Sequence, residues 1–165
     1  MLDDIPVLCK ISDFQFTKEY YAILAITDCT AKEMLYEKYI KGKCNLFTFV
    51  SSKTLLGKNV VIGDGAIICP NTIISNSTVI GDLVTINISS NIGHDCNIAS
   101  FSSIMVSVTL GGHCNLGKSV FMGSNSVIIP NKNIGDFIKI GAGAVIYNDL
   151  KVEGTYIGNP ARKMF

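Results

Sequence analysis

The stretch Asn87–Ile98, NISSNIGHDCNI, places a histidine and a carboxylate side by side at His94 and Asp95. Neutral imidazole is the side chain best suited to accept a proton at neutral pH. An adjacent carboxylate can orient the ring and stabilise its protonated form. We therefore interpret His94 as a candidate general base oriented by Asp95. The alternative is that His94 is an ordinary exposed histidine at a turn.

Two further polar positions could contribute to a site. Asn87 precedes the histidine by seven residues and could hydrogen-bond an amino or hydroxyl group of a substrate. Its alternative role is to stack with other Asn side chains in or beside a regular coil. His113 is the second of the two histidines, and we expect it to be a surface residue at a turn. Asp64 and Asp136 are likewise expected to be solvated turn acids.

The cysteines do not suggest a metal centre. They stand at positions 9, 29, 44, 69, 96 and 114, and no two of them form a Cys-x-x-Cys pair. Structural zinc sites use closely spaced Cys and His ligands, and the chain has only two histidines, so we expect no metal. Free thiols in a reducing cytosol are the simplest interpretation.

A repeat of six residues must position the His94–Asp95 pair. From Val50 to Ile146, every sixth residue is aliphatic or Met. Glycine is frequent one residue later, and four residues later the side chain is usually small or branched, with Lys132 as the exception. This period matches neither a helix nor a single long strand. It predicts a parallel β-solenoid in which the aliphatic residues point inward and successive coils bury one another.

The repeat also predicts the size of the solenoid and the place of the histidine. Three hexads per coil would give about five coils over residues 50–147. His94 comes two residues after the inward Ile92, so we expect it at an exposed turn, where a neighbouring subunit could form the other wall of a site.

The segments before and after the repeat lack its six-residue pattern. Residues 19–26 form an apolar run suited to a buried strand, residues 31–41 favour a helix closed by Gly42, and residues 44–50 favour a second strand. Strand, helix and strand at this spacing predict a βαβ unit, so residues 1–49 are expected to be a small partial α/β domain. Residues 148–165 leave the repeat and are expected to cap its open end.

Composition and charge exclude several classes of protein. The 165 residues are 48% hydrophobic and 16% charged, enough apolar content for a sizeable core. A net charge of +1 gives no basic excess for nucleic acid or a membrane surface. The N-terminus, MLDDIPVLCK, lacks a signal-peptide layout, and no apolar run is long enough for a membrane span. We expect a cytoplasmic protein.

Three motifs resemble the hexapeptide-repeat acyltransferases. They are the hexads of the form Ile-Gly-x-x-small-x, the GAGAV sequence of residues 141–145, and the ending GNPAR of residues 158–162. The resemblance implies a left-handed parallel β-helix, a homotrimer and acetyl-CoA as cosubstrate. The stretch from Asn87 to Ile98, with His94-Asp95-Cys96, is similar to the active-site stretch of the sialic acid O-acetyltransferase-like family. That family includes N-acetyltransferases of nucleotide-linked amino sugars.

The resemblance also implies roles for individual residues. His94 would be the general base and Asp95 its orienting acid, while Asn87 could bind the acceptor. CoA would contact mostly backbone in the groove between two solenoids, and Gly112 could also supply a backbone N–H to the tetrahedral oxyanion. The implied CoA contacts are Ser103, Gly112, Ser124, Ala142 and Gly143.

The sequence departs from the family in two places. Ser103 stands where many relatives carry a second histidine. Relatives also begin with a strand and a Gly-rich turn that hold the nucleotide of the acceptor, whereas this sequence begins at what resembles their second strand. The acidic pair Asp3 and Asp4, together with Thr27, matches positions near the nucleotide and sugar in the family.

The expected function is an acetyl-CoA-dependent acetyltransferase that acts on the amino group of an amino sugar, most simply a nucleotide-linked one, in surface-glycan biosynthesis. One alternative is an O-acetyltransferase of the sialic acid type, which would use the same base. A carbonic anhydrase-like zinc enzyme would need three histidines per site, and the chain has two. A solenoid scaffold without enzymatic activity is the remaining alternative.

Overall fold

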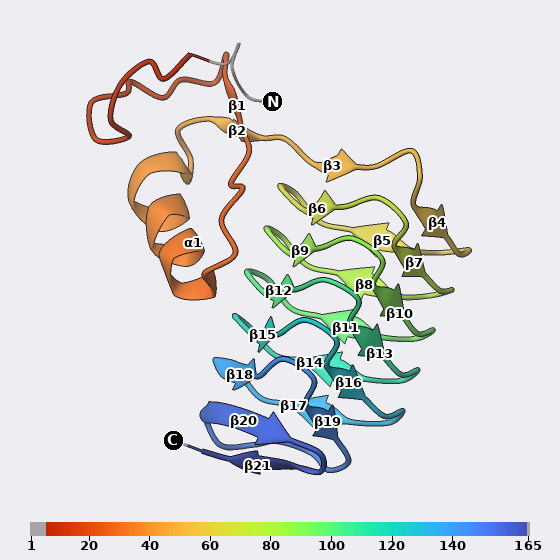
Figure 1. Ribbon diagram of the computed structural model, residues 1–165. Helices are drawn as coiled ribbons and strands as arrows, with labels where there is room; N and C mark the ends of the chain where they lie inside the picture. The colour runs from red at the N-terminus through yellow and green to blue at the C-terminus, as the bar shows by residue number, and fades with distance from the viewer. Residues whose placement is uncertain (1–5, 165) are drawn as a thin grey trace.

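The computed structural model describes residues 6–164, so Asp3 and Asp4 lie outside the described part of the chain. Three parallel sheets wind into a solenoid, with a small helical unit on one side (Figure 1). The strands of the regular repeat are two residues long, except for the three-residue β18, and successive strands otherwise begin six residues apart. The six-residue repeat therefore predicts the fold correctly: each hexad is one strand and one turn.

Each complete coil contributes one strand to each sheet, and we name each sheet after one of its members. The β12 sheet contains β3 (Phe49–Val50), β6 (Ile67–Ile68), β9 (Thr85–Ile86), β12 (Ser103–Ile104), β15 (Phe121–Met122), β18 (Ile138–Ile140), β20 (Gly154–Gly158) and β21 (Ala161–Lys163). The β10 sheet contains β4 (Leu55–Leu56), β7 (Ile73–Ile74), β10 (Asn91–Ile92), β13 (Thr109–Leu110), β16 (Val127–Ile128) and β19 (Val145–Ile146). The β11 sheet contains β5 (Val61–Ile62), β8 (Val79–Ile80), β11 (Asn97–Ile98), β14 (Asn115–Leu116) and β17 (Asn133–Ile134).

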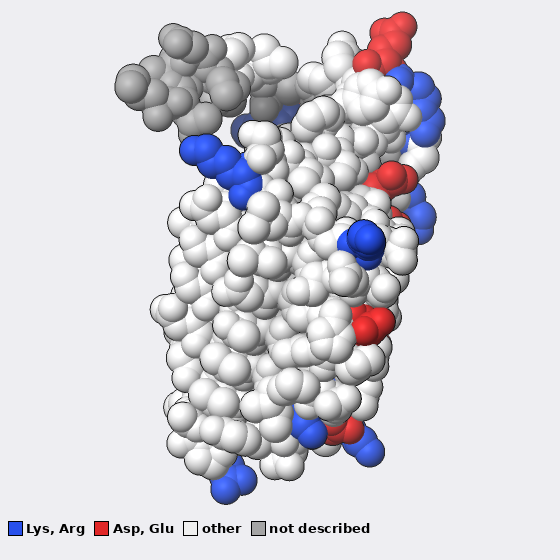
Figure 2. All heavy atoms as spheres, turned by 90° about the vertical axis from the view of Figure 1, so that its right-hand side faces the viewer, with Lys and Arg blue, Asp and Glu red and all other residues white. Residues whose placement is uncertain are grey.

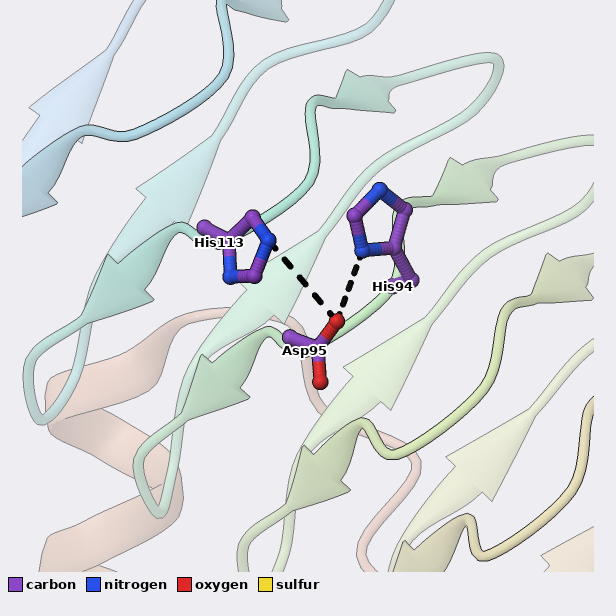
Figure 3. Close-up of side chains that lie close together, drawn as sticks. All are labelled: His94, Asp95 and His113. Atoms are coloured by element: carbon purple, nitrogen blue, oxygen red, sulfur yellow. Dashed lines mark hydrogen bonds and ion pairs between the residues drawn. The ribbon is translucent and has the colours of Figure 1, made fainter.

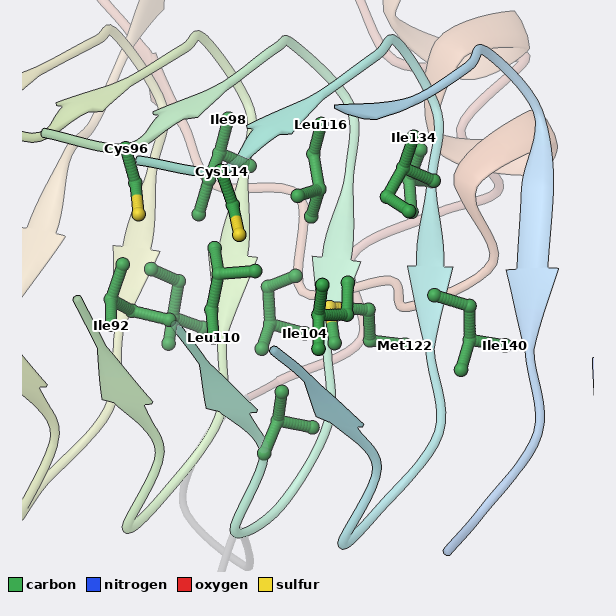
Figure 4. Packing of buried hydrophobic residues seen from close by; sticks show 14 of the residues in the cluster. Ile92, Cys96, Ile98, Ile104, Leu110, Cys114, Leu116, Met122, Ile134 and Ile140 are labelled. Carbon is green, nitrogen blue, oxygen red and sulfur yellow. The ribbon is translucent and has the colours of Figure 1, made fainter. Parts of the chain in front are cut away.

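Neighbouring coils pair in a constant register of 18 residues. In the β10 sheet Ile92 pairs with Leu110, and in the β12 sheet Ile104 pairs with Met122. Each inward side chain therefore stacks on its equivalent one coil away (Figure 4). The predicted inward residues from Ile68 to Ile146 are at most 3% exposed, so the predicted register is confirmed over this range.

The first coil is the exception to this prediction. Val50 is 36% exposed and Leu56 is 48% exposed. Both occupy inward positions of the repeat, but no earlier coil of the described chain covers them. The strands β3 to β19, three to a coil, make between five and six coils, slightly more than the predicted number.

Turn geometry is as regular as the strands. A non-glycine residue with positive φ recurs every six residues through most of the repeat, including Asp95 and His113. Small polar residues inside the coil donate to turn carbonyls of the next coil, as Thr78 does to Gly93 at 2.8 Å and Cys96 to Gly111 at 3.2 Å. Because these buried polar groups are hydrogen-bonded, the turns are held in place on the core side.

The N-terminal unit has the predicted strand–helix–strand order but is smaller than predicted. Its elements are β1 (Tyr21–Ala22), α1 (Cys29–Leu35), the π-helical turn η1 (Tyr36–Ile40) and β2 (Asn45–Leu46). The strands β1 and β2 pair in parallel. The single strand predicted over residues 44–50 is wrong, because β2 pairs with β1 whereas β3 enters the solenoid. Asp28 caps α1 by accepting a hydrogen bond from the N–H of Ala31 at 2.8 Å.

The helix docks on the outer face of the β12 sheet (Figure 1). Lys32 is fully buried there, and its Nζ donates to the carbonyl of Leu83 at 2.9 Å and to the hydroxyls of Thr85 at 3.1 Å and Ser103 at 3.0 Å. Glu33 adds an ion pair with Lys118. The helical unit is thereby fixed to one face of the solenoid by polar contacts that the sequence pattern did not predict.

The C-terminal residues continue the solenoid and then turn back. The strand β20 pairs in parallel with β18, and β21 pairs antiparallel with β20. Tyr156 is buried against the last coil, and its hydroxyl donates to the carbonyl of Val152 at 2.8 Å. Within residues 6–164 no helix has the length and apolar character needed to cross a membrane.

Candidate active site

The turn between β10 and β11 carries His94 and Asp95 at the corner where the β10 and β11 sheets meet. Asn76 and Asp136 occupy the same turn position in other hexads. Each accepts a hydrogen bond at 2.7 Å from a backbone N–H of the previous coil, that of Lys58 or Lys118 respectively. His94 instead turns toward its neighbour Asp95. His94 therefore contacts Asp95 with its ring, whereas Asn76 and Asp136 link two coils through their side chains.

The imidazole of His94 and the carboxylate of Asp95 are in direct contact (Figure 3). Nδ1 of His94 lies 2.7 Å from Oδ2 of Asp95. Because a carboxylate accepts, the proton of the neutral ring belongs on Nδ1, and Nε2 is left to accept a proton from a substrate. The side chains are 56% and 47% exposed, so both are accessible to a bound molecule.

Gly112 lies against the other edge of the His94 ring, in the turn one coil further along. A β-carbon built on Gly112 would lie 2.7 Å from Nε2 of His94. A side chain there would displace the ring, because real β-carbons do not approach other atoms so closely. Gly112 thus contributes the space in which the proton-accepting nitrogen lies.

His113 also belongs to this cluster, although the sequence pattern indicated only a surface residue. It is exposed as predicted, but its ring packs edge-to-face on that of His94 with centroids 4.8 Å apart. Its Nε2 lies 3.9 Å from Oδ2 of Asp95. Position 113 follows position 95 by one 18-residue coil, so the signal that could have placed it was the coil length rather than the hexad position.

Cys96 follows the pair but is not available as a nucleophile. Its side chain is buried inside the coil, and Sγ contacts the carbonyls of His94 and Gly111. Burial raises the pKa of the Cys96 thiol to about 11. The thiol is therefore protonated at neutral pH, and its role is to fix the backbone of the turn.

Three of the predicted CoA contacts gather on one corner of the solenoid. Ser124 lies in the turn after β15, and Ala142 and Gly143 lie in the equivalent turn one coil later. The N–H of Gly143 donates to the carbonyl of Ser124 at 2.9 Å. This corner and the corner of His94 and Gly112 flank the same face, that of the β10 sheet.

The face of the β10 sheet carries few charges (Figure 2). The outward residues of its strands are all uncharged: Leu55, Ile73, Asn91, Thr109, Val127 and Val145.

Ser103 is the one predicted CoA contact that the structure places elsewhere. Its side chain is fully buried under α1, and its hydroxyl accepts a hydrogen bond from Lys32. The predicted contact of Ser103 with CoA is therefore wrong for this chain, because the side chain has no surface to offer.

Of the predicted acceptor-side residues, the structure describes Asn87 and Thr27, and Thr27 lies apart from His94. Asn87 follows β9, and its Oδ1 accepts a hydrogen bond from the N–H of Ile88 at 2.8 Å. Thr27 lines a cleft of about 370 Å³ with Asp28, Cys29, Thr30, Ser119, Phe121, Phe137, Lys139 and Glu153. Phe121 of β15 and Lys139 of β18 line this cleft, so it lies over the β12 sheet. That sheet is the face opposite the corner that carries His94.

Burial also shifts the pKa values of the two groups where α1 meets the sheet. Desolvation lowers the pKa of the Lys32 ammonium to about 8, since no carboxylate compensates its charge among the acceptors that it contacts. Desolvation likewise raises the pKa of the Cys29 thiol, which the contact with Ser103 only partly offsets.

Comparison with known proteins gives matches in structure. No protein-family model and no curated protein matches the chain. A mutant of perosamine N-acetyltransferase from Caulobacter crescentus, bound to CoA and GDP-perosamine, matches with a TM-score of 0.83 and 25% identity, over 88% of this chain and 69% of that chain.

Two further structures share the fold. The acetyltransferase domain of PglB from Neisseria gonorrhoeae FA1090, in complex with acetyl coenzyme A, matches with a TM-score of 0.83 and 21% identity, over 93% of this chain and 75% of that chain. WeeI from Acinetobacter baumannii AYE matches with a TM-score of 0.60 and 24% identity, over 93% and 74%. These matches support the left-handed β-helix implied by the resemblance. With its six-residue repeat, its parallel solenoid and these neighbours, the chain has the architecture of a hexapeptide-repeat acetyltransferase.

Proposed function

We propose that this protein is an acetyl-CoA-dependent acetyltransferase that transfers the acetyl group to the amino group of a nucleotide-linked amino sugar. The observation that carries the proposal is the contact of 2.7 Å between His94 Nδ1 and Asp95 Oδ2, which leaves Nε2 to act as a base at an exposed corner of the solenoid. A structural neighbour bound to CoA and GDP-perosamine supports the choice of cosubstrate and acceptor.

The geometry favours direct transfer without an acyl-enzyme. Cys96, the thiol adjacent to the pair, is buried and protonated. In the proposed reaction the sugar nitrogen attacks the thioester carbonyl, the N–C bond forms, and the C–S bond then breaks to release the CoA thiolate. Nε2 of His94 takes the proton that the nitrogen loses, and Asp95 stabilises the imidazolium that results. The backbone N–H of Gly112, the glycine that lies against the His94 ring, is our candidate donor to the oxyanion.

We place CoA along the face of the β10 sheet. Gly112 at one corner of this face, and Ser124, Ala142 and Gly143 at the other, are small residues that allow a ligand to approach the backbone. The uncharged outward residues of the strands between them fit either a pantetheine arm or a second solenoid.

The separation of the two halves of the site supports an oligomer, and the resemblance to hexapeptide-repeat acyltransferases implies a homotrimer. Thr27 and its cleft lie on the face opposite the corner of His94, so they cannot line one pocket in a single chain. In an oligomer, the cleft of one copy could bring an acceptor to the His94 of the next. We propose residues 1–49 as the acceptor-side partial α/β domain, with Asp3, Asp4, Thr27 and Asn87 near the acceptor, residues 50–147 as the catalytic β-helix, and residues 148–165 as its cap.

We propose that the protein acts in the cytoplasm and feeds surface-glycan biosynthesis. All six cysteines lie in the described part of the chain and are free thiols, a state that a reducing compartment maintains.

The test is acetyl transfer from acetyl-CoA to a panel of UDP-, dTDP- and GDP-linked amino sugars, free sialic acid and serine. We expect thiol release with at least one nucleotide-linked amino sugar. Release only with hydroxyl acceptors would instead identify an O-acetyltransferase. No release with any acceptor, together with no binding of acetyl-CoA, would refute the enzymatic proposal.

A further inference from the structure

Three potential metal-ligand atoms meet at the turn of His94. One atom each from His94, Asp95 and His113 lies within 4.8 Å of the others, and all three side chains are exposed (Figure 3). They come from two neighbouring coils that are joined by the hydrogen bond from the N–H of His113 to the carbonyl of His94 at 2.9 Å. The backbone that carries the three ligands is therefore part of the regular ladder of the solenoid.

The set of ligand types suits a transition-metal ion of the zinc class. Two imidazoles and one carboxylate, with a side left open to solvent, form an open zinc site in many proteins. Ligand atoms bound to one Zn²⁺ at about 2.0–2.2 Å lie roughly 3.3 Å apart in a tetrahedron. The Asp95 oxygen is 2.7 Å from His94 Nδ1 and 3.9 Å from His113 Nε2, which bracket this value. All three atoms lie within 4.8 Å of one another, so binding requires the exposed side chains to rotate toward the ion.

Mg²⁺ and Ca²⁺ are poor candidates for the same cluster. Both ions prefer several oxygen ligands, and this group supplies only one carboxylate. Imidazole nitrogen favours Zn²⁺, Ni²⁺ or Cu²⁺ instead.

We propose that His94, Asp95 and His113 form a binding site for a Zn²⁺-type ion, and that occupation of this site inhibits the enzyme. The inhibitory part rests on the proposed function. An ion on Nδ1 of His94 displaces the hydrogen bond to Asp95 and leaves the remaining ring proton on Nε2, which then cannot act as a base. An ion on Nε2 blocks the base directly. Either way, the ion and proton acceptance at His94 are mutually exclusive.

Binding is tested first, without any assay of activity. Equilibrium dialysis of the full chain against ZnCl₂ alone should show about one ion per chain, with a dissociation constant in the micromolar range. Cys9 is an exposed free thiol, so both the reference protein and the variants carry Cys9→Ser. His113→Asn removes one ligand and keeps a residue that tolerates the positive φ of 56° at this position. It should weaken binding by about tenfold or more.

Asn131→Gly is the matched control, because position 131 has the equivalent positive φ one coil later and lies outside the cluster. It should bind zinc as the reference protein does. Absence of binding at 0.1 mM Zn²⁺ (about a hundred times a micromolar dissociation constant) would overturn the site. Unchanged binding in His113→Asn would overturn it as well, because the ion would then lie elsewhere.

Inhibition is tested second, with product followed by chromatography because CoA itself binds zinc. Zinc should inhibit the reference protein reversibly, with recovery on addition of EDTA. The inhibitory concentration should rise by about tenfold or more in His113→Asn, with each protein normalised to its own rate without zinc. Equal inhibition of both proteins would contradict the inhibitory role. If no acceptor supports turnover, the proposed function fails, whereas the dialysis experiment still decides the metal site.

Discussion

The ring of His94 lies directly against Gly112, one coil further along the solenoid, and a β-carbon at that glycine would stand 2.7 Å from Nε2. Because Gly112 has no side chain, its coil leaves room for the imidazole of His94 in the preceding coil. This relationship links a residue with no side chain to the position of the proposed base.

Gly112→Ala should therefore impair the reaction more than the fold. The methyl group would push Nε2 away from its position, and we expect kcat to fall by about 10- to 100-fold, the size of effect that small misplacements produce. Gly135→Ala is the matched control, since the nearest atom to its added β-carbon would be 3.4 Å away. Steady-state kinetics and thermal melting of both variants give the comparison. Equal kcat values would show that Gly112 does not position the base.

Ile92→Asp tests the inward register beside the site. Ile92 is 1% exposed, so the substitution would bury an unpaired carboxylate in the core. We expect a loss of at least about 3 kcal/mol in the free energy of unfolding, or failure to fold. Asn91→Asp places the same charge on the adjacent, exposed position of β10 and should change stability by less than about 0.5 kcal/mol. Denaturant unfolding of the two variants checks the prediction, which similar midpoints would refute.

The buried Lys32 predicts an unusual dependence of stability on pH. Its pKa is lowered to about 8 in the folded protein, from 10.5 for a free lysine. Between pH 8 and pH 10.5 the unfolded state holds more protons than the folded state, so the free energy of unfolding rises with pH as the cost of burying the ammonium is relieved.

Comparison with Lys32→Met removes the contribution of the other titrating groups, which remain in both proteins. Cys29 remains as well, although its pKa depends in part on the charge of Lys32. The free energy of unfolding of the wild type, relative to Lys32→Met, should rise by about 2 kcal/mol between pH 7 and pH 9.5. Urea unfolding at both pH values measures the difference. A difference that stays constant or falls would mean that the ammonium is not destabilised by burial.

The sequence predicts the solenoid well because every hexad carries an aliphatic residue or Met at the same position. Ile92 and its equivalents must all point inward, since a single shift would expose the whole set. Val50 and Leu56 occupy the same position of the repeat but are not buried. Burial also depends on a neighbouring coil, which the first coil lacks on one side.

The site was only partly predictable. The adjacency of His94 and Asp95 is visible in the sequence, whereas the approach of His113 follows from the stacking of coils at 18 residues. The burial of Ser103 by Lys32 depends on where the helix docks, and no local pattern encodes that contact. Contacts within one hexad could thus be predicted, and contacts between the repeat and the helical unit could not.

The central claim is that His94 is the base of an acetyl transfer, and one comparison tests it most directly. Thiol release from acetyl-CoA with the best nucleotide-linked amino sugar is measured for the wild type and for His94→Ala, with thermal melting of both. The account predicts that kcat falls by about 10²- to 10⁴-fold while the melting temperature stays within a few degrees, because the side chain is 56% exposed. A His94→Ala variant with near-normal kcat would contradict the account.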